Sequence, residues 1–381
     1  MILPRWLHRM LFMVAATEPE GLDGIQPAAA TARTRFEDDM PMLRAAAELT
    51  RDLVAPNPMI YWPDFFASAL IGYGAMAGAI MVQPVWLAVL LGLVSILGMY
   101  RAGLFIHELT HIRHAALPWF RFVWNGVIGI PLLAPSFLYE GLHSLHHART
   151  RYGTVEDPEY LPLALMKPWT IPAFVVVSVV APFALLLRFG ILGPLSFVIP
   201  PLRRFLVARY SGLVINPEFR RRAPEGDFRR IWLSQEIAAT LWAMLVLAGL
   251  WFGIIPLRPF LIICAIAAGL IMLNQIRTLV AHRWENDGAV ISTTAQFLDS
   301  VNVPPPGIIP ALWAPVGLRY HAIHHLLPGL PYHALGEAHR RLTAALPSDS
   351  AYHQANDHGL PKLVWALMMG AGKDKAAIPN K

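Results

Sequence analysis

The chain has 381 residues, of which 55% are hydrophobic and only 15% are charged, and its formal net charge is +6. A soluble globular chain carries about 25% charged residues, so this composition predicts one integral membrane domain instead of several soluble ones. The arginines border apolar segments, which favours a membrane surface over nucleic acid as the partner of a basic chain. The single cysteine, Cys264, excludes an intramolecular disulfide, a cysteine-based zinc site and a cysteine-ligated iron–sulfur cluster.

The first 64 residues are mixed in character. Residues 5–14 combine basic and apolar side chains without a convincing signal-peptide cleavage site, which predicts an interfacial segment. The run from Met40 to Val54 has helical periodicity and ends before two prolines. We expect residues 1–64 to form a cytoplasmic or interfacial segment ahead of the membrane domain.

Two apolar runs, residues 65–82 and 85–106, predict a first membrane hairpin. The first run contains Gly72, Gly74 and Gly78. These glycines indicate close helix packing and not a nucleotide-binding loop, because no basic or acidic partner follows them. The second run leads into the segment His107-Glu108-Leu109-Thr110-His111, which places two imidazoles at positions i and i+4 of a helix.

Residues 119–138 are apolar but contain two prolines, and they precede a second cluster, His143-x-x-His146-His147. We expect this segment to re-enter the membrane or lie along its surface, because a true crossing would separate the first two clusters. Residues 169–187 and 189–198 predict either a hairpin or two shallow interfacial pieces. In both cases the basic run 203–230 returns to the arginine-rich side.

Residues 237–255 and 259–279 predict the last hairpin, which is followed by His282 and by a third cluster, His321-x-x-His324-His325. The three clusters hold eight of the fifteen histidines. The hairpins and the bordering arginines place all of them on one side, which the positive-inside rule makes cytoplasmic. The sequence thus predicts an all-α integral membrane protein with two or three transmembrane helical hairpins and a cytoplasmic histidine-rich cap. We expect a membrane domain over residues 65–335 and a cytoplasmic tail over residues 336–381.

The nine histidines on this side predict a transition-metal site, because neutral imidazole is a transition-metal ligand. Nine ligands are too many for one four-coordinate ion and suit two ions. Iron that activates oxygen fits all-nitrogen ligation, although imidazole also suits zinc and copper. Only Glu140-x-x-His143 has the Glu-x-x-His spacing of soluble di-iron bundles, so a carboxylate-rich site is not available. Four carboxylates are expected either to orient imidazole N–H groups or to be plain surface groups: Glu108, Glu140, Asp157 and Asp287.

The order, spacing and placement of the three clusters resemble the histidine boxes of the membrane fatty acid desaturase superfamily, from about Phe65 to Leu335. The resemblance implies two iron ions, O2 as co-substrate and no catalytic or cofactor-binding residue beyond the metal ligands. It implies His282 as a ninth ligand, with Thr278 where some members carry an assisting asparagine. The implied ligand set is His107, His111, His143, His146, His147, His282, His321, His324 and His325.

This resemblance predicts an O2-dependent di-iron fatty acid desaturase that introduces a double bond into a lipid acyl chain. A hydroxylase, a ketolase and an alkene-forming decarboxylase remain alternatives, because relatives run these reactions with similar boxes. A histidine-rich metal transporter is a more remote alternative, since transport predicts ligands near the bilayer midplane.

The chain lacks the His-Pro-Gly-Gly motif of a fused cytochrome b5, so we expect a separate ferredoxin- or rubredoxin-type protein to supply electrons. The expected location is the bacterial inner membrane, with the active site on the cytoplasmic side. The expected substrate is an acyl lipid, held in an apolar tunnel. Four aromatic residues are predicted to line that tunnel: Trp124, Phe137, Tyr139 and Trp313.

Overall fold

The computed structural model describes residues 37–357 and 359–370, and within them the regular structure is helical, with no β-strand. The interfacial segment predicted at residues 5–14 lies outside the described residues, as does the end of the C-terminal tail. The predicted helix at residues 40–54 forms as α3 (Met40–Leu49), followed by the 3₁₀ turn η1 (Arg51–Leu53).

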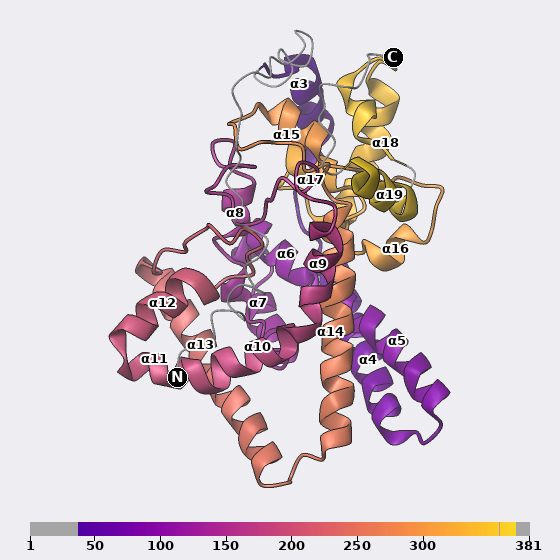
Figure 1. Cartoon of the computed structure of the whole chain (residues 1–381). Coiled ribbons are helices and arrows are strands. Elements are labelled where there is room, and N and C mark those ends of the chain that lie inside the picture. Colours follow the sequence, from indigo (N-terminus) through magenta and orange to yellow (C-terminus); the bar gives the residue numbers. More distant parts are fainter. Residues whose placement is uncertain (1–36, 358, 371–381) are drawn as a thin grey trace.

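Four long helices form two hairpins: α4 (Pro58–Met81) with α5 (Val85–Gly103), and α13 (Gly226–Trp251) with α14 (Leu257–Leu279). In Figure 1 both hairpins extend to the bottom of the view, and α14 lies beside α5. Large apolar side chains on these helices face outward, among them Leu70, Met81 and Leu245. Contiguous apolar surface of this kind is rare on soluble proteins and suits contact with lipid. The prediction of an all-α integral membrane protein built on helical hairpins is confirmed.

Two glycines allow the two helices of the first hairpin to pack closely against each other. A Cβ at Gly72 would lie 2.7 Å from the side chain of Met99, and a Cβ at Gly98 would lie 2.7 Å from the backbone nitrogen of Gly72. The two backbones approach this closely only because both positions lack a side chain. The prediction that glycines serve helix packing is confirmed at Gly72, whereas Gly74 faces open space.

The segment after the first hairpin turns back towards it. Helix α6 (Phe105–His111) continues α5 after a break at Leu104, and then come η2 (His114–Ala116), α7 (Phe120–Trp124), the π-helical turn η3 (Asn125–Gly129) and η4 (Ser136–Leu138). The indole of Trp124 donates to the carbonyl of Ala102 at 2.9 Å, which ties α7 to the end of α5. This segment therefore folds back onto the end of the first hairpin, and its placement within or along the membrane stays a prediction.

The next apolar segment, residues 170–198, is long enough to span a membrane but is broken into pieces. The pieces are α9 (Thr170–Val176), η5 (Val177–Val180), α10 (Ala181–Leu187), the π-helical turn η6 (Arg188–Leu192) and α11 (Gly193–Val198), and α12 (Pro200–Tyr210) follows. In Figure 1, α9 stands beside α14, while α10 and α11 run across the left half of the view, below α7 and α12. Beyond α12, the amide of Ile215 donates to the carbonyl of Pro158 at 2.9 Å. The segment thus begins and ends on the same side and wraps around the second hairpin.

Short helices form a cap above the hairpins, seen at the top of Figure 1. The cap has its own core, in which Phe297, Ile323, Leu342 and Tyr352 are fully buried. Helix α3 packs against α18, so the segments before and after the membrane domain contact each other; the division into three domains stays a prediction. The cap helices are α8 (His143–His146), α15 (Thr293–Asp299), α16 (Pro310–Trp313), α17 (His321–Leu326), η7 (Tyr332–Ala334), α18 (Leu335–Ala345), η8 (Ala351–Ala355) and α19 (Leu360–Gly370).

Candidate metal centre

All nine histidines singled out by the sequence gather between the cap and the ends of the hairpins. They form two groups, and within each group one nitrogen from every ring lies within 4.8 Å of the others. The rings of His147 and His325, which belong to different groups, stack with centroids 4.3 Å apart, so the groups adjoin. The first group is His107, His111, His143, His147 and His324; the second is His146, His282, His321 and His325.

Each three-histidine box is divided between the two groups. In the second box His143 and His147 join the first group, whereas His146 joins the second. In the third box His321 and His325 stay together and His324 goes to the other group. A helix turns by about 100° per residue, so an i, i+4 pair shares a face while the residue next to it points elsewhere. One box therefore supplies both groups.

The nitrogen-to-nitrogen distances within the groups fit a shared metal ion. Five Nε2–Nε2 separations lie between 3.0 and 3.3 Å. Imidazole nitrogens about 2.1 Å from one ion lie about 3.0 Å apart at right angles and about 3.4 Å apart in a tetrahedron. Nε2 of His107 and of His111 is also buried without a hydrogen-bond partner. Buried lone pairs that face each other are unfavourable unless a cation lies between them, so the donor set fits transition-metal ions.

Polar side chains contact the Nδ1 atoms of several of these imidazoles and so fix the orientation of the rings. His146 Nδ1 lies 2.9 Å from Asp157, and His143 Nδ1 lies 2.9 Å from Glu159. Nδ1 of His282 lies 2.9 Å from the Tyr152 hydroxyl, which donates to Asp299. Because that hydroxyl oxygen is left to accept, the proton of His282 resides on Nδ1 and its Nε2 lone pair faces the group.

Only some of the four carboxylates predicted to orient imidazoles lie near one of the nine histidines. Asp157 has this contact, and Glu108 lies 3.7 Å from Nδ1 of His107. Glu140 contacts none of the nine histidines and is buried, accepting from Ser136 and pairing with Arg121, so it has neither of the two expected roles. For Asp287 the role stays a prediction.

Sequence reasoning missed several polar partners of the histidines. Glu159 could have been found, because it lies two residues after Asp157 in the acidic stretch that follows the second box. Asp299 acts through Tyr152, and the Gln296 amide lies 3.0 Å from Nδ1 of His325. No spacing in the sequence pointed to these two residues.

Burial keeps most of these imidazoles neutral. It lowers the pKa of His143, His282 and His325 well below the ordinary value of 6.5, and the neighbouring histidines lower it further. Burial opposes charge on His146 too, but Asp157 and other nearby carboxylates raise its pKa overall. Burial also raises the pKa of Glu159 to about 7. Neutral imidazole is the form that binds a metal ion, so the site is ready for metal near neutral pH.

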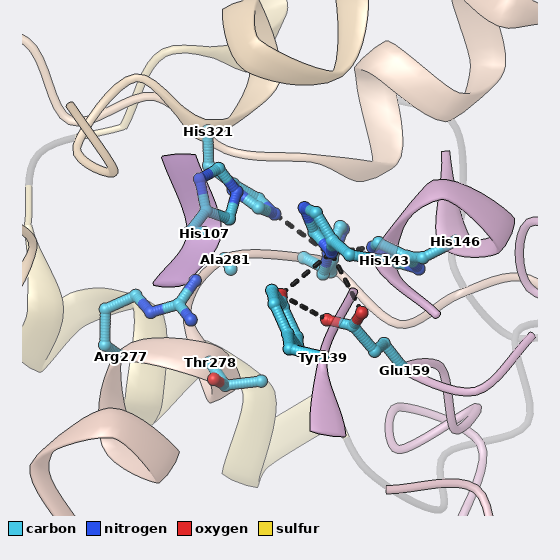
Figure 2. Close-up of a pocket in the computed structure, with 10 residues that line it drawn as sticks. His107, Tyr139, His143, His146, Glu159, Arg277, Thr278, Ala281 and His321 are labelled. Atoms are coloured by element: carbon cyan, nitrogen blue, oxygen red, sulfur yellow. Dashed lines mark hydrogen bonds and ion pairs between the residues drawn. The ribbon is translucent and has the colours of Figure 1, made fainter. Parts of the chain in front are cut away.

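A small cavity reaches the histidines from the end of α14. It is about 30 Å³ in size, and a water molecule needs about 10–15 Å³, so it holds one or two small groups. Figure 2 shows Tyr139, Glu159 and Arg277 on its wall beside the histidines. Among the four aromatic residues predicted to line a tunnel, only Tyr139 lines this cavity. The other three lie in the protein core: Trp124, Phe137 and Trp313.

Membrane-spanning helices and buried histidines at their ends define a membrane protein with a candidate two-ion transition-metal centre. The chain belongs to the fatty acid desaturase family, whose model, described as fatty acid desaturase, matches residues 82–356. It is 49% identical over 343 residues to a ceramide hydroxylase of Caulobacter vibrioides (strain NA1000 / CB15N). That alignment covers 90% of this chain and 97% of the relative. The chain is therefore an oxidoreductase of the family in which desaturases and hydroxylases share similar boxes.

Proposed function

We propose that this protein is a membrane di-iron lipid hydroxylase that inserts one oxygen atom from O2 into a C–H bond of a ceramide-type lipid. The observation that carries the proposal is the nearly end-to-end similarity to a ceramide hydroxylase, which includes the whole histidine-rich region. It favours hydroxylation, which the sequence left as an alternative, over the desaturation that was the main prediction.

The nine histidines are proposed to hold two iron ions, one in each group. Bound iron would supply the power to activate O2 and attack an unactivated C–H bond. The protein's own part is to keep the Nε2 lone pairs directed inward and the site dry. Asp157 and Glu159 hold the Nδ1 protons of His146 and His143, and the cap buries both groups.

Hydroxylation with O2 needs two electrons from outside the chain, because the second oxygen atom is reduced to water. We propose a separate small electron carrier of the ferredoxin or rubredoxin type, acting on the cytoplasmic face of a bacterial inner membrane. The support is the basic character of this side, where exposed Arg149 and half-buried Arg151 follow the second box.

Product analysis tests the proposal. The protein would be expressed in cells that make ceramide, or supplied with dihydroceramide, a reduced carrier and ¹⁸O2, and the lipids analysed by mass spectrometry. The expected product is heavier by one labelled oxygen atom, and it is absent for a His147→Ala variant. A product lighter by two hydrogens and free of label would make desaturation the function. No change in any ceramide-type lipid would refute the proposed substrate.

A further inference from the structure

Arg277 is a buried cation at the end of a membrane helix, next to the histidine groups. It lies in the last turn of α14 and lines the small cavity together with Thr278, Tyr139 and Glu159. A guanidinium carries five N–H donors. Nε of Arg277 is buried without a partner, and Nη2 donates to Asn274 at 3.3 Å. The Tyr100 hydroxyl also interacts with this guanidinium. Among the described residues Arg277 forms no ion pair, and its Nε donor is left without an acceptor.

The orientation of Arg277 is unusual for its position. A cation near a helix C-terminus is favoured by the helix dipole, but long basic side chains at the ends of membrane helices normally extend to the water interface. Arg277 instead turns inward and is only 9% exposed. Burying a charged donor without an acceptor costs free energy. An acceptor that enters the cavity in the working enzyme would remove that cost.

The size and lining of the cavity restrict what this acceptor is. The cavity takes one or two small groups, which excludes an acyl chain but admits a carbonyl or hydroxyl oxygen. In the view of Figure 2, Arg277 and Glu159 lie on opposite sides of Tyr139. Both residues line the same cavity of about 30 Å³, so a carboxylate ligand would place a second acidic group close to Glu159. A neutral oxygen avoids this repulsion and still accepts from the guanidinium.

We infer that Arg277 binds a neutral oxygen of the substrate's polar head, the amide carbonyl or a hydroxyl of a ceramide-type lipid, and so selects the lipid and the carbon that reacts. This inference rests on the proposed function. Histidines from both groups, including His143 and His146, line the same cavity. An oxygen held there brings carbons within a few bonds of the polar head to the site and keeps the middle of the chain away from it.

Binding measurements on purified protein in detergent, with iron bound and no reductant, test the contact without turnover. The probes are dihydroceramide, its thioamide analogue, in which sulfur replaces the amide oxygen, and its 3-deoxy analogue. Wild type is expected to bind dihydroceramide at least about tenfold more tightly than one of the two analogues, because a hydrogen bond to a charged donor is lost. Arg277→Gln is expected to lose that preference while keeping its iron content and Tm.

The matched control is Arg283→Gln, at an exposed arginine on the same side that donates to a backbone carbonyl of the cap. It is expected to keep the wild-type preference. Two results would overturn the inference directly: Arg277→Gln retains the preference, or wild type distinguishes neither analogue. It is also overturned if wild type binds a free fatty acid of equal chain length more tightly than dihydroceramide and Arg277→Gln loses that binding. Should Arg277→Gln not fold, Arg277→Lys, which keeps the charge, is expected to fold and to show a weakened preference.

Fragmentation of the product separates this inference from the proposed function. A hydroxyl group placed within a few carbons of the amide is expected. A mid-chain hydroxyl would overturn the role of Arg277 and leave the hydroxylase proposal standing. A desaturated product made with an intact Arg277-dependent preference would refute hydroxylation and leave the role of Arg277 standing.

Discussion

Replacing Asp157 with asparagine is expected to weaken metal binding in the second histidine group without unfolding the protein. The Asp157 side chain is fully buried, and its two oxygens accept the backbone N–H groups of Gly153 and Glu159, both at 2.8 Å. The same oxygens lie 2.9 and 3.1 Å from Nδ1 of His146. Asparagine offers one oxygen and one NH2 group, so in either orientation one backbone donor faces another donor.

The magnitude follows from these contacts. One unsatisfied buried donor costs about 1–3 kcal/mol of stability, which is less than the total stability of a typical protein. Loss of the carboxylate behind a metal-binding imidazole lowers metal affinity about 10–100-fold, which corresponds to about 1.4–2.7 kcal/mol. We therefore expect a folded variant with a lower Tm and with weaker iron binding.

The assay is competition for iron between the purified protein and a chelator, together with a thermal unfolding scan. The matched control is Glu156→Gln, one residue earlier, where the carboxylate is mostly exposed and lies 3.6 Å from Arg151. A surface pair of this kind contributes about 0–1 kcal/mol, so the control should bind iron as wild type does. Equal iron affinity in Asp157→Asn and wild type would refute the argument that Asp157 acts through His146.

Three further predictions follow from the site and the topology. His282→Asn is expected to lower bound iron from about two ions per chain towards one and to abolish activity at normal membrane expression. The control His333→Asn, at a histidine outside the two groups, should keep its iron content and its activity. Normal iron in His282→Asn would contradict the role of His282 as a ligand. Reporter fusions after Arg151 and Arg283 should both report the cytoplasm, and opposite locations would break the single-site arrangement. Acidification of the metal-free protein below about pH 6.5 should lower its Tm, because the histidines become protonated in the unfolded chain but stay neutral where they are buried in the folded protein. Eight histidines outside the membrane spans have lowered pKa values, against one histidine and two carboxyl groups there with raised ones, and a Tm that rises on acidification would contradict this sign.

The sequence by itself determined the helical hairpins, the membrane setting and the histidines of the site. These features depend on local rules: an apolar run of sufficient length must form a helix in lipid, and the spacing of i, i+3 and i+4 places side chains on one face. The single-sidedness of the site also followed, because hairpins return the chain to the side from which it started. The family resemblance added His282, which has no local signal of its own.

Only the tertiary structure decided how those histidines are divided between the two groups. His146 and His147 are neighbours in the chain but belong to different groups, since the choice depends on which rings the distant His282 and His324 bring near. The same applies to the broken helix at residues 170–198, whose composition fits a membrane span although contacts beyond it return the chain to the same side. The inward turn of Arg277 is likewise invisible in the sequence, because the direction of a long side chain at a helix end depends on the packing around it.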